Sequence, residues 1–128
     1  MERLSERLAD ARRALTSFDE LATRRERSVI ERDAAIMRFA YTFEAVWNAA
    51  QLYLYEHEGV EVGSPKQSIR ASRRVGLLTD EQPEAALSMA DDRNLVVHTY
   101  REAVASDLGT RLPAHALTLA AWLGAMGS

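Results

Sequence analysis

The chain has 128 residues, of which 47% are hydrophobic and 27% charged, and these values are typical of one globular domain over residues 1–128. A formal net charge of -3 excludes nucleic-acid binding through the overall field of the molecule, so such binding requires a local basic patch. The absence of cysteine excludes disulfides and thiol chemistry, and the three histidines lack the paired spacing of zinc ligands, so we expect no metal site.

Residues 1–22 place apolar side chains at alternating spacings of three and four, which predicts a first amphipathic helix. Charged residues near its start, among them Glu2 and Arg3, exclude the apolar core of a signal peptide. No apolar run approaches the roughly 18 residues that a membrane-spanning helix needs. We therefore expect a cytoplasmic protein that does not enter the membrane.

A second and longer helix is expected from Val29 to His57. Between Ile36 and Tyr55 its apolar residues occupy much more than one face, and a helix with so much apolar surface needs cover on two sides. In a small bundle the second cover is most simply another copy of the chain, so the pattern predicts a homodimer.

Capping residues mark the next two helices. Ser64 is a good N-cap, and Pro65 after it favours the start of a short third helix that ends at Gly76. The spacing of Thr79 and Gln82 matches a capping box, which predicts that a fourth helix starts there.

The last part of the chain again shows helical spacing. It resumes over residues 101–108, and Gly109 and Pro113 then interrupt the chain before a strongly apolar helix over residues 114–126. The expected fold is therefore all-α, an antiparallel up-and-down four-helix bundle with an additional short helix.

The segment DDRNLVVHTY, residues 91–100, carries three chemically capable side chains in a chain that otherwise has helical patterns. On one helix Arg93 and Tyr100 share a face, whereas Arg93 and His98 differ by about 140°. The three can converge only if the backbone breaks between Val96 and Tyr100, or if part of the set comes from a second subunit. The β-branched residues favour a break, because they crowd the preceding helical turn.

These groups suit the cleavage of a phosphodiester without a metal ion. His98 can take a proton from a 2′-hydroxyl or return one to the leaving oxygen. Arg93 can stabilise the charge of the transition state through a bidentate contact. Asn94 can hydrogen-bond to a phosphate or a base, and Tyr100 can stack, donate to phosphate or be modified. The alternative interpretation is a structural histidine at a helix end.

Two further groups of polar residues have helical spacing. Four basic side chains predict a face that contacts the RNA backbone, with a solvated face as the alternative: Lys66, Arg70, Arg73 and Arg74. A line on the second helix either flanks a site or forms a seam between helices: Tyr41, Glu44, Asn48 and Gln51.

Three stretches of the chain resemble a known family in the same order: RFAYTFEAVW (38–47), SPKQSIRASRRVGLL (64–78) and DDRNLVVHTYRE (91–102). They resemble the nucleotidyltransferase substrate-binding proteins, which belong to the HepT-like branch of the HEPN (higher eukaryotes and prokaryotes nucleotide-binding) superfamily. The resemblance extends over most of the region from residue 30 to residue 110, and it is far more specific than a single motif.

The family signature is an arginine, four residues, a histidine, any residue and a tyrosine. It falls on Arg93, His98 and Tyr100, and Asn94 supplies the frequent polar residue after the arginine. Arg101 departs from the pattern, because relatives more often have an acidic or amide residue there. An extra positive charge beside Tyr100 can either aid the binding of RNA or change the contact with a partner.

The resemblance implies a helical-bundle homodimer in which two motifs meet in a cleft at the interface. It further implies a metal-independent endoribonuclease toxin of a toxin–antitoxin pair, with Arg93 and His98 as catalytic residues and no required cofactor. The implied antitoxin is a small nucleotidyltransferase that uses ATP to attach AMP to Tyr100. The alternative is a non-catalytic subunit that presents a nucleotide or another substrate to a separate nucleotidyltransferase.

Overall fold

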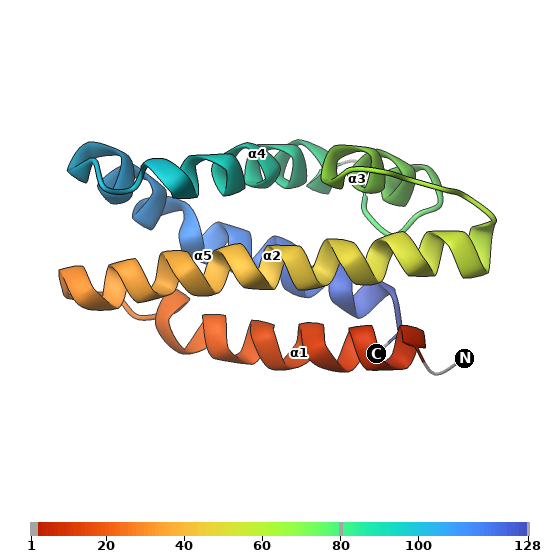
Figure 1. Cartoon of the computed structure of the whole chain (residues 1–128), viewed down its shortest axis with the longest axis horizontal. Coiled ribbons are helices and arrows are strands. Elements are labelled where there is room, and N and C mark those ends of the chain that lie inside the picture. Colours follow the sequence, from red (N-terminus) through yellow and green to blue (C-terminus); the bar gives the residue numbers. More distant parts are fainter. Residues whose placement is uncertain (1–2, 80, 128) are drawn as a thin grey trace.

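The computed structural model describes residues 3–79 and 81–127, except for the side chains of residues 82 and 83. Within these residues the regular structure consists of helices alone (Figure 1). The helices of this described part are α1 (Arg3–Ala22), α2 (Val29–Glu58), α3 (Pro65–Arg74), α4 (Gln82–Leu95), the 3-10 helix η1 (Val96–His98) and α5 (Glu102–Ala125). The predicted all-α fold is confirmed. None of these helices is both long and apolar enough to cross a membrane.

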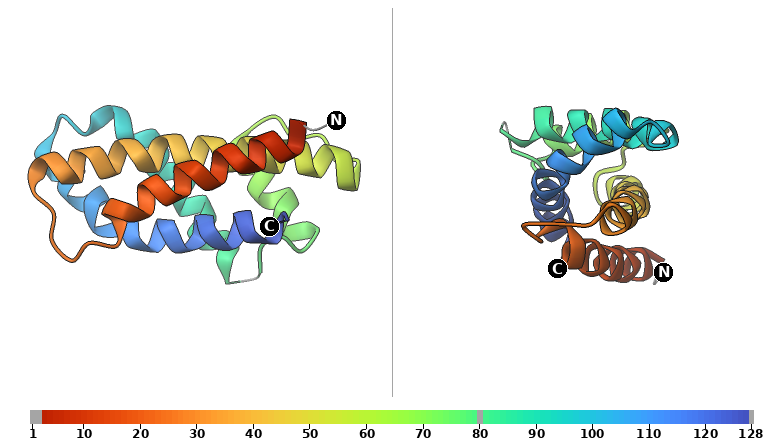
Figure 2. Two further views of the ribbon diagram at one scale, coloured as in Figure 1. Left: turned by 90° about the horizontal axis from the view of Figure 1, so that it is seen from below. Right: turned by 90° about the vertical axis from the view of Figure 1, so that its left-hand side faces the viewer.

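The four long helices alternate in direction, and the short α3 lies beside α4 (Figure 1). α2 packs against α1, α3, α4 and α5, so it is the central element of the bundle. In the end view, α1 and α4 lie on opposite sides of the pair formed by α2 and α5 (Figure 2). Local signals fix both ends of α2: Ser28 and Glu31 form a capping box, and Gly59 ends the helix in the left-handed conformation at φ 68°.

The core follows the inner face of α2, where Phe39, Phe43 and Val46 are fully buried. The sequence pattern predicted that a second copy of the chain covers part of the apolar surface of α2. Most of that surface is instead covered by the neighbouring helices of the same chain. The large apolar side chains of α2 that stay exposed are Val29, Ile30, Met37, Tyr41 and Tyr55. The apolar surface left for a partner is therefore limited, and the homodimer stays a prediction.

The N-cap of α4 is Glu81, which makes no side-chain capping hydrogen bond. The predicted pairing of Thr79 with Gln82 as a capping box involves the side chain of Gln82, which lies outside the described residues. The chain is still outside the helix at Thr79. Just before it, Leu77 and Leu78 bury their side chains in the core, and this tertiary contact holds the connection in a non-helical path.

α5 is one continuous helix through Gly109 and Pro113, so the predicted interruption of the helix at these two residues is wrong. Pro113 has no N–H to give to the carbonyl of Gly109, four residues earlier. That carbonyl instead accepts a hydrogen bond from Nη2 of Arg27 at 2.7 Å. Gly109 leaves room for the side chain of Arg32 on α2, because a Cβ there would lie 3.2 Å from Cγ of Arg32 and that side chain would have to shift.

We expect Arg27→Ala to lower the free energy of unfolding by about 1–3 kcal/mol, because it leaves the Gly109 carbonyl without its partner. The loss should be smaller in a Pro113→Ala background, where residue 113 supplies the missing helical N–H. Arg27 also donates to Leu21 O at 3.0 Å, so the rescue is partial. Urea denaturation of the wild type, Arg27→Ala, Pro113→Ala and the double variant measures both effects. Arg25→Ala, which removes an exposed arginine, is the control. Equal losses in the two backgrounds would contradict this account of the continuous α5.

Candidate functional site

The backbone breaks within the motif segment, at the place where the sequence predicts a distortion. α4 ends at Leu95, and η1 then turns the chain through a single 3-10 turn. The N–H and the hydroxyl of Thr99 both donate to Val96 O, at 3.3 Å and 2.8 Å, and the N–H of Arg101 donates to His98 O at 3.1 Å. These bonds satisfy carbonyl groups of η1 locally, and α5 then starts in the opposite direction.

The break separates the motif residues into two groups. Arg93 lies in the last turn of α4, and its Nη2 donates to Oε1 of Glu44 on α2 at 3.0 Å. His98 and Tyr100 lie in the exposed junction between α4 and α5, with ring centroids 6.5 Å apart, and the Tyr100 side chain is 81% exposed. Among the described contacts, Glu44 and not His98 is the partner of Arg93.

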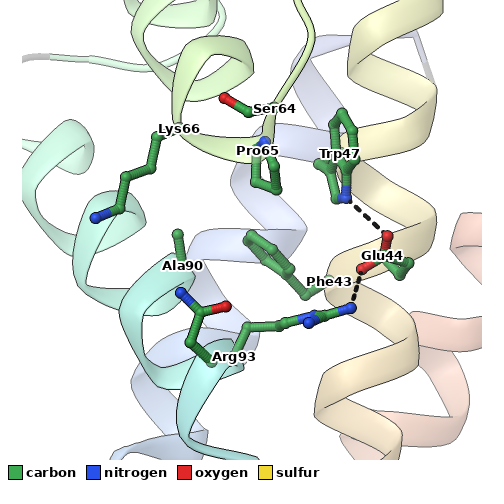
Figure 3. Close-up of a pocket in the computed structure, with 9 residues that line it drawn as sticks. Phe43, Glu44, Trp47, Ser64, Pro65, Lys66, Ala90 and Arg93 are labelled. Carbon is green, nitrogen blue, oxygen red and sulfur yellow. Dashed lines mark hydrogen bonds and ion pairs between the residues drawn. The ribbon is translucent and has the colours of Figure 1, made fainter.

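A cavity of about 450 Å³ lies between α2, α3 and α4 (Figure 3). Its lining combines apolar rings, two cations, a carboxylate and an amide, from Phe43, Glu44, Trp47, Ser64, Pro65, Lys66, Ala90, Arg93 and Asn94. Two residues of the sequence motif, Arg93 and Asn94, therefore share a cavity with Lys66 from the predicted basic face. His98 and Tyr100 are not part of the lining.

Glu44 joins two walls of this cavity. Its Oε1 accepts from Arg93, and its Oε2 accepts from the indole N–H of Trp47 at 3.1 Å, as the dashed lines in Figure 3 show. Lys66 forms an ion pair with Asp91 at 2.7 Å. Each of the two cations of the cavity is thus paired with a carboxylate of the same chain. An anionic ligand can bind there only if it displaces one of these two carboxylates.

The rest of the predicted polar line on α2 forms seams with other elements. The Tyr41 hydroxyl lies 2.7 Å from the Ser17 hydroxyl of α1, and the Gln51 amide donates to Val62 O at 2.9 Å. Only Glu44 of this line is part of the cavity lining. Tyr41 and Gln51 therefore join α2 to neighbouring segments, whereas Glu44 lines the cavity.

The predicted basic face of α3 divides in the structure. Lys66 lines the cavity beside Arg93, whereas Arg70 and Arg74 line a separate hollow of about 270 Å³. Arg70, Arg73 and Arg74 are all exposed. The four residues therefore do not surround one pocket, and as RNA contacts they would form a track along α3.

A buried polar network lies directly behind the motif. Asp92 accepts from Nε and Nη2 of Arg111 at 2.8 Å and 2.9 Å, and from Nε2 of His115 at 2.6 Å. An ionised carboxylate can only accept, so Nε2 of His115 carries the proton. The imidazole also stacks on Phe39, with ring centroids 5.0 Å apart. The network ties α4 to α5 one residue before Arg93.

This network was not predicted from the sequence. Its one local signal was the four-residue spacing of Arg111 and His115, which places both on one face of α5. Burial raises the pKa of Asp92, but the hydrogen bonds from Arg111 and His115 outweigh it and hold that pKa below its ordinary value. Burial lowers the pKa of His115 despite the opposing effect of Asp92. The folded state thus keeps an ionised Asp92 and a neutral His115.

Comparison with known proteins places these features in a family context. Residues 6–127 match the family described as nucleotidyltransferase substrate binding protein like. A protein from Thermus thermophilus with a known crystal structure is 51% identical, with a TM-score of 0.89 over 92% of this chain and 99% of that chain. No curated protein matches the chain.

We expect the free energy of unfolding to fall as the pH falls from 7.5 to 5. The pKa of His115 is lower in the folded state, so the unfolded state binds more protons, and the loss starts near the ordinary histidine pKa of about 6.5. The lowered pKa of Asp92 adds to the loss only at more acidic pH. His115→Gln keeps an N–H donor but does not titrate, so it should flatten this dependence. Urea denaturation at the two pH values measures it. His98→Gln, which leaves the buried pair intact, is the control, and an unchanged slope in His115→Gln would contradict the assignment.

Proposed function

Because the chain belongs to the nucleotidyltransferase substrate binding protein like family, we propose that it is the toxin of a toxin–antitoxin pair and cleaves RNA in the cytoplasm. Arg93 and His98 are its catalytic residues. The observation that carries this proposal is the junction between α4 and α5, where the helix stops between these two residues. It leaves the imidazole of His98 exposed and within reach of a substrate.

The chemistry needs only side chains of this protein. His98 takes the proton of a 2′-hydroxyl, the 2′-oxygen attacks the adjacent phosphorus, and the bond from phosphorus to the 5′-oxygen breaks. The leaving 5′-oxygen then takes a proton from the imidazolium of His98, which returns to its neutral form and leaves a 2′,3′-cyclic phosphate. Arg93 stabilises the additional charge on the phosphorus oxygens, and Asn94 adds a neutral hydrogen bond. The basic track of α3 supports the RNA backbone through Lys66, Arg70, Arg73 and Arg74.

A second copy of the chain completes the site. Within one subunit Arg93 is paired with Glu44, and His98 lies outside the cavity that Arg93 lines. Two exposed apolar side chains, Met37 of α2 and Val97 of η1, offer surface for a symmetric partner. In such a homodimer His98 of one subunit faces Arg93 of the other.

The protein partner is a small nucleotidyltransferase that acts as the antitoxin. It uses ATP to attach AMP to the hydroxyl of Tyr100, and the exposure of that side chain supports this assignment. The AMP group adds bulk and negative charge beside His98, which blocks the approach of RNA. This chain itself requires no cofactor.

One observation favours a second candidate function. The cavity between α2, α3 and α4 gathers Arg93, Lys66 and Trp47 but not His98. A site of this composition suits binding without catalysis, as in a subunit that presents a nucleotide to a separate nucleotidyltransferase.

We expect the wild-type protein to cleave RNA in the presence of EDTA, and His98→Ala to lose about 10²–10⁴-fold in rate because the general acid–base group is gone. A denaturing gel of a labelled RNA measures the rates. His57→Ala is the matched control, since this exposed histidine stacks on Tyr53 at the other end of α2. Equal cleavage by wild type and His98→Ala, or none by wild type, would count against the nuclease.

The same assay tests the homodimer through mixed subunits. Arg93→Ala and His98→Ala are each inactive alone, but a dimer that contains one of each has one intact site if the two residues act across the interface. Mixing the two variants should therefore restore part of the activity. No recovery after proven exchange of subunits would place both residues in one subunit and overturn the shared site.

We expect Tyr100 to be the residue that receives AMP. Incubation with the partner nucleotidyltransferase and ATP should raise the mass of the wild-type chain by one AMP group, and Tyr100→Phe should stay unmodified because it has no hydroxyl. Mass spectrometry of the intact chain measures this. Tyr55→Phe, which removes another exposed tyrosine hydroxyl, is the matched control and should still be modified. Modification of Tyr100→Phe would assign the AMP to another residue.

A further inference from the structure

We propose that the cavity between α2, α3 and α4 binds one nucleotide, and that Glu44 occupies the place of its phosphate until the nucleotide enters. The base lies against Trp47, and the phosphate contacts Arg93 and Lys66. The inference rests on the proposed function in taking a nucleotide as the ligand class, but it concerns binding alone and involves no bond cleavage.

The position of Glu44 supports an exchange of anions. Its carboxylate bridges the guanidinium of Arg93 and the indole N–H of Trp47, and both donors line the cavity. The side chains of Arg93 and Glu44 are 42% and 40% exposed, so the pair is accessible to solvent and easily broken. A phosphate offers more negative charge and more acceptor oxygens than a carboxylate, so it binds the same donors more strongly.

The second cation is paired in the same way. Lys66 contacts Asp91 at 2.7 Å, in a pair that is exposed on both sides. Its ammonium group can move to a ligand phosphate, because the lysine side chain is long and flexible. Lys66 and Arg93 come from α3 and α4 and line the same cavity. In Figure 3 the amine of Lys66 points away from the guanidinium of Arg93, so it must turn to reach a shared phosphate.

The apolar wall fits a base. Trp47 is partly buried and packs against the core, so its ring is held in place and offers a rigid surface, whereas the fully buried Phe43 has no exposed surface for a base. Stacking on an aromatic ring accepts every base, because each base has a π-face. A volume of about 450 Å³ lies within the range of small-molecule sites.

Hydrogen-bonding groups are available at the rim. The amide of Asn94 provides both donors and an acceptor. The Ser64 hydroxyl accepts from the N–H of Gln67 at 3.2 Å, and its own O–H remains to donate. These groups can orient a ribose or a base edge once stacking and charge have placed the nucleotide.

The test is a titration of the full-length protein with AMP, UMP, ribose 5-phosphate and inorganic phosphate. Isothermal calorimetry measures affinity, and tryptophan fluorescence locates the ligand, because Trp47 lines the cavity whereas Trp122 is fully buried. We expect the two nucleotides to quench the emission and to bind more tightly than ribose 5-phosphate or phosphate. Inorganic phosphate that binds as tightly as AMP would overturn the base contact.

Three variants test the roles of the charges. Glu44→Gln should bind AMP more tightly, by up to about five-fold, because the internal competitor is gone. Lys66→Ala should weaken binding about ten-fold through the loss of a charge-assisted contact. Arg13→Ala on α1 also removes one positive charge, but from an exposed site outside the cavity, so it should change nothing. Weaker binding by Glu44→Gln would overturn the exchange.

Cleavage of RNA by the same proteins separates this inference from the proposed function. Binding of AMP without any RNA cleavage upholds the nucleotide site and counts against the nuclease. RNA cleavage without detectable binding of AMP or UMP at millimolar concentration overturns the nucleotide site and leaves the nuclease standing.

Discussion

The buried carboxylate of Asp92 is the interaction on which the arrangement of the site depends. It accepts three hydrogen bonds from Arg111 and His115, so the last turn of α4 is fixed against α5. Successive residues of a helix point about 100° apart. When Asp92 faces α5, Arg93 is therefore turned toward α2, where Glu44 meets it. A structural ion pair thus sets the direction of a catalytic candidate.

The end of α4 follows from the same constraint. After Asp92 is anchored, two β-branched valines in a row crowd a regular helical turn, and the chain adopts the tighter turn of η1. This places His98 and Tyr100 at the surface and lets α5 run back along the bundle (Figure 1). A regular helix through this region would carry His98 to a face away from Arg93. The break does not join the two residues, but it removes the helical geometry that would keep them apart.

The features that the sequence predicted are those set by local contacts. The ends of α2 and the start of α3 depend on residues a few positions away, such as Ser28 with Glu31 and Ser64 with Gln67. The backbone break was predictable for the same reason, since β-branched residues act on their own turn.

The features that could not be predicted from the sequence depend on distant partners. The continuity of α5 through Pro113 relies on Arg27, 82 positions before the carbonyl that it satisfies, and Arg93 meets Glu44 across 49 positions. Patterns of helical spacing contain no information on such pairs, because they arise only when the helices pack.

Internal neutralisation explains how a chain with a net charge of -3 can offer a site for a polyanion. Arg93 and Lys66 are each balanced by a carboxylate, so the cavity by itself has little net field and attracts few anions from a distance. A ligand that carries a carboxylate gains nothing when it replaces Glu44, because it offers the same group. A phosphate brings additional charge and acceptors to the same donors. In the proposed nucleotide site, such a cavity would therefore discriminate by the chemistry of the anion, and it would favour phosphates over acidic peptides without a basic surface.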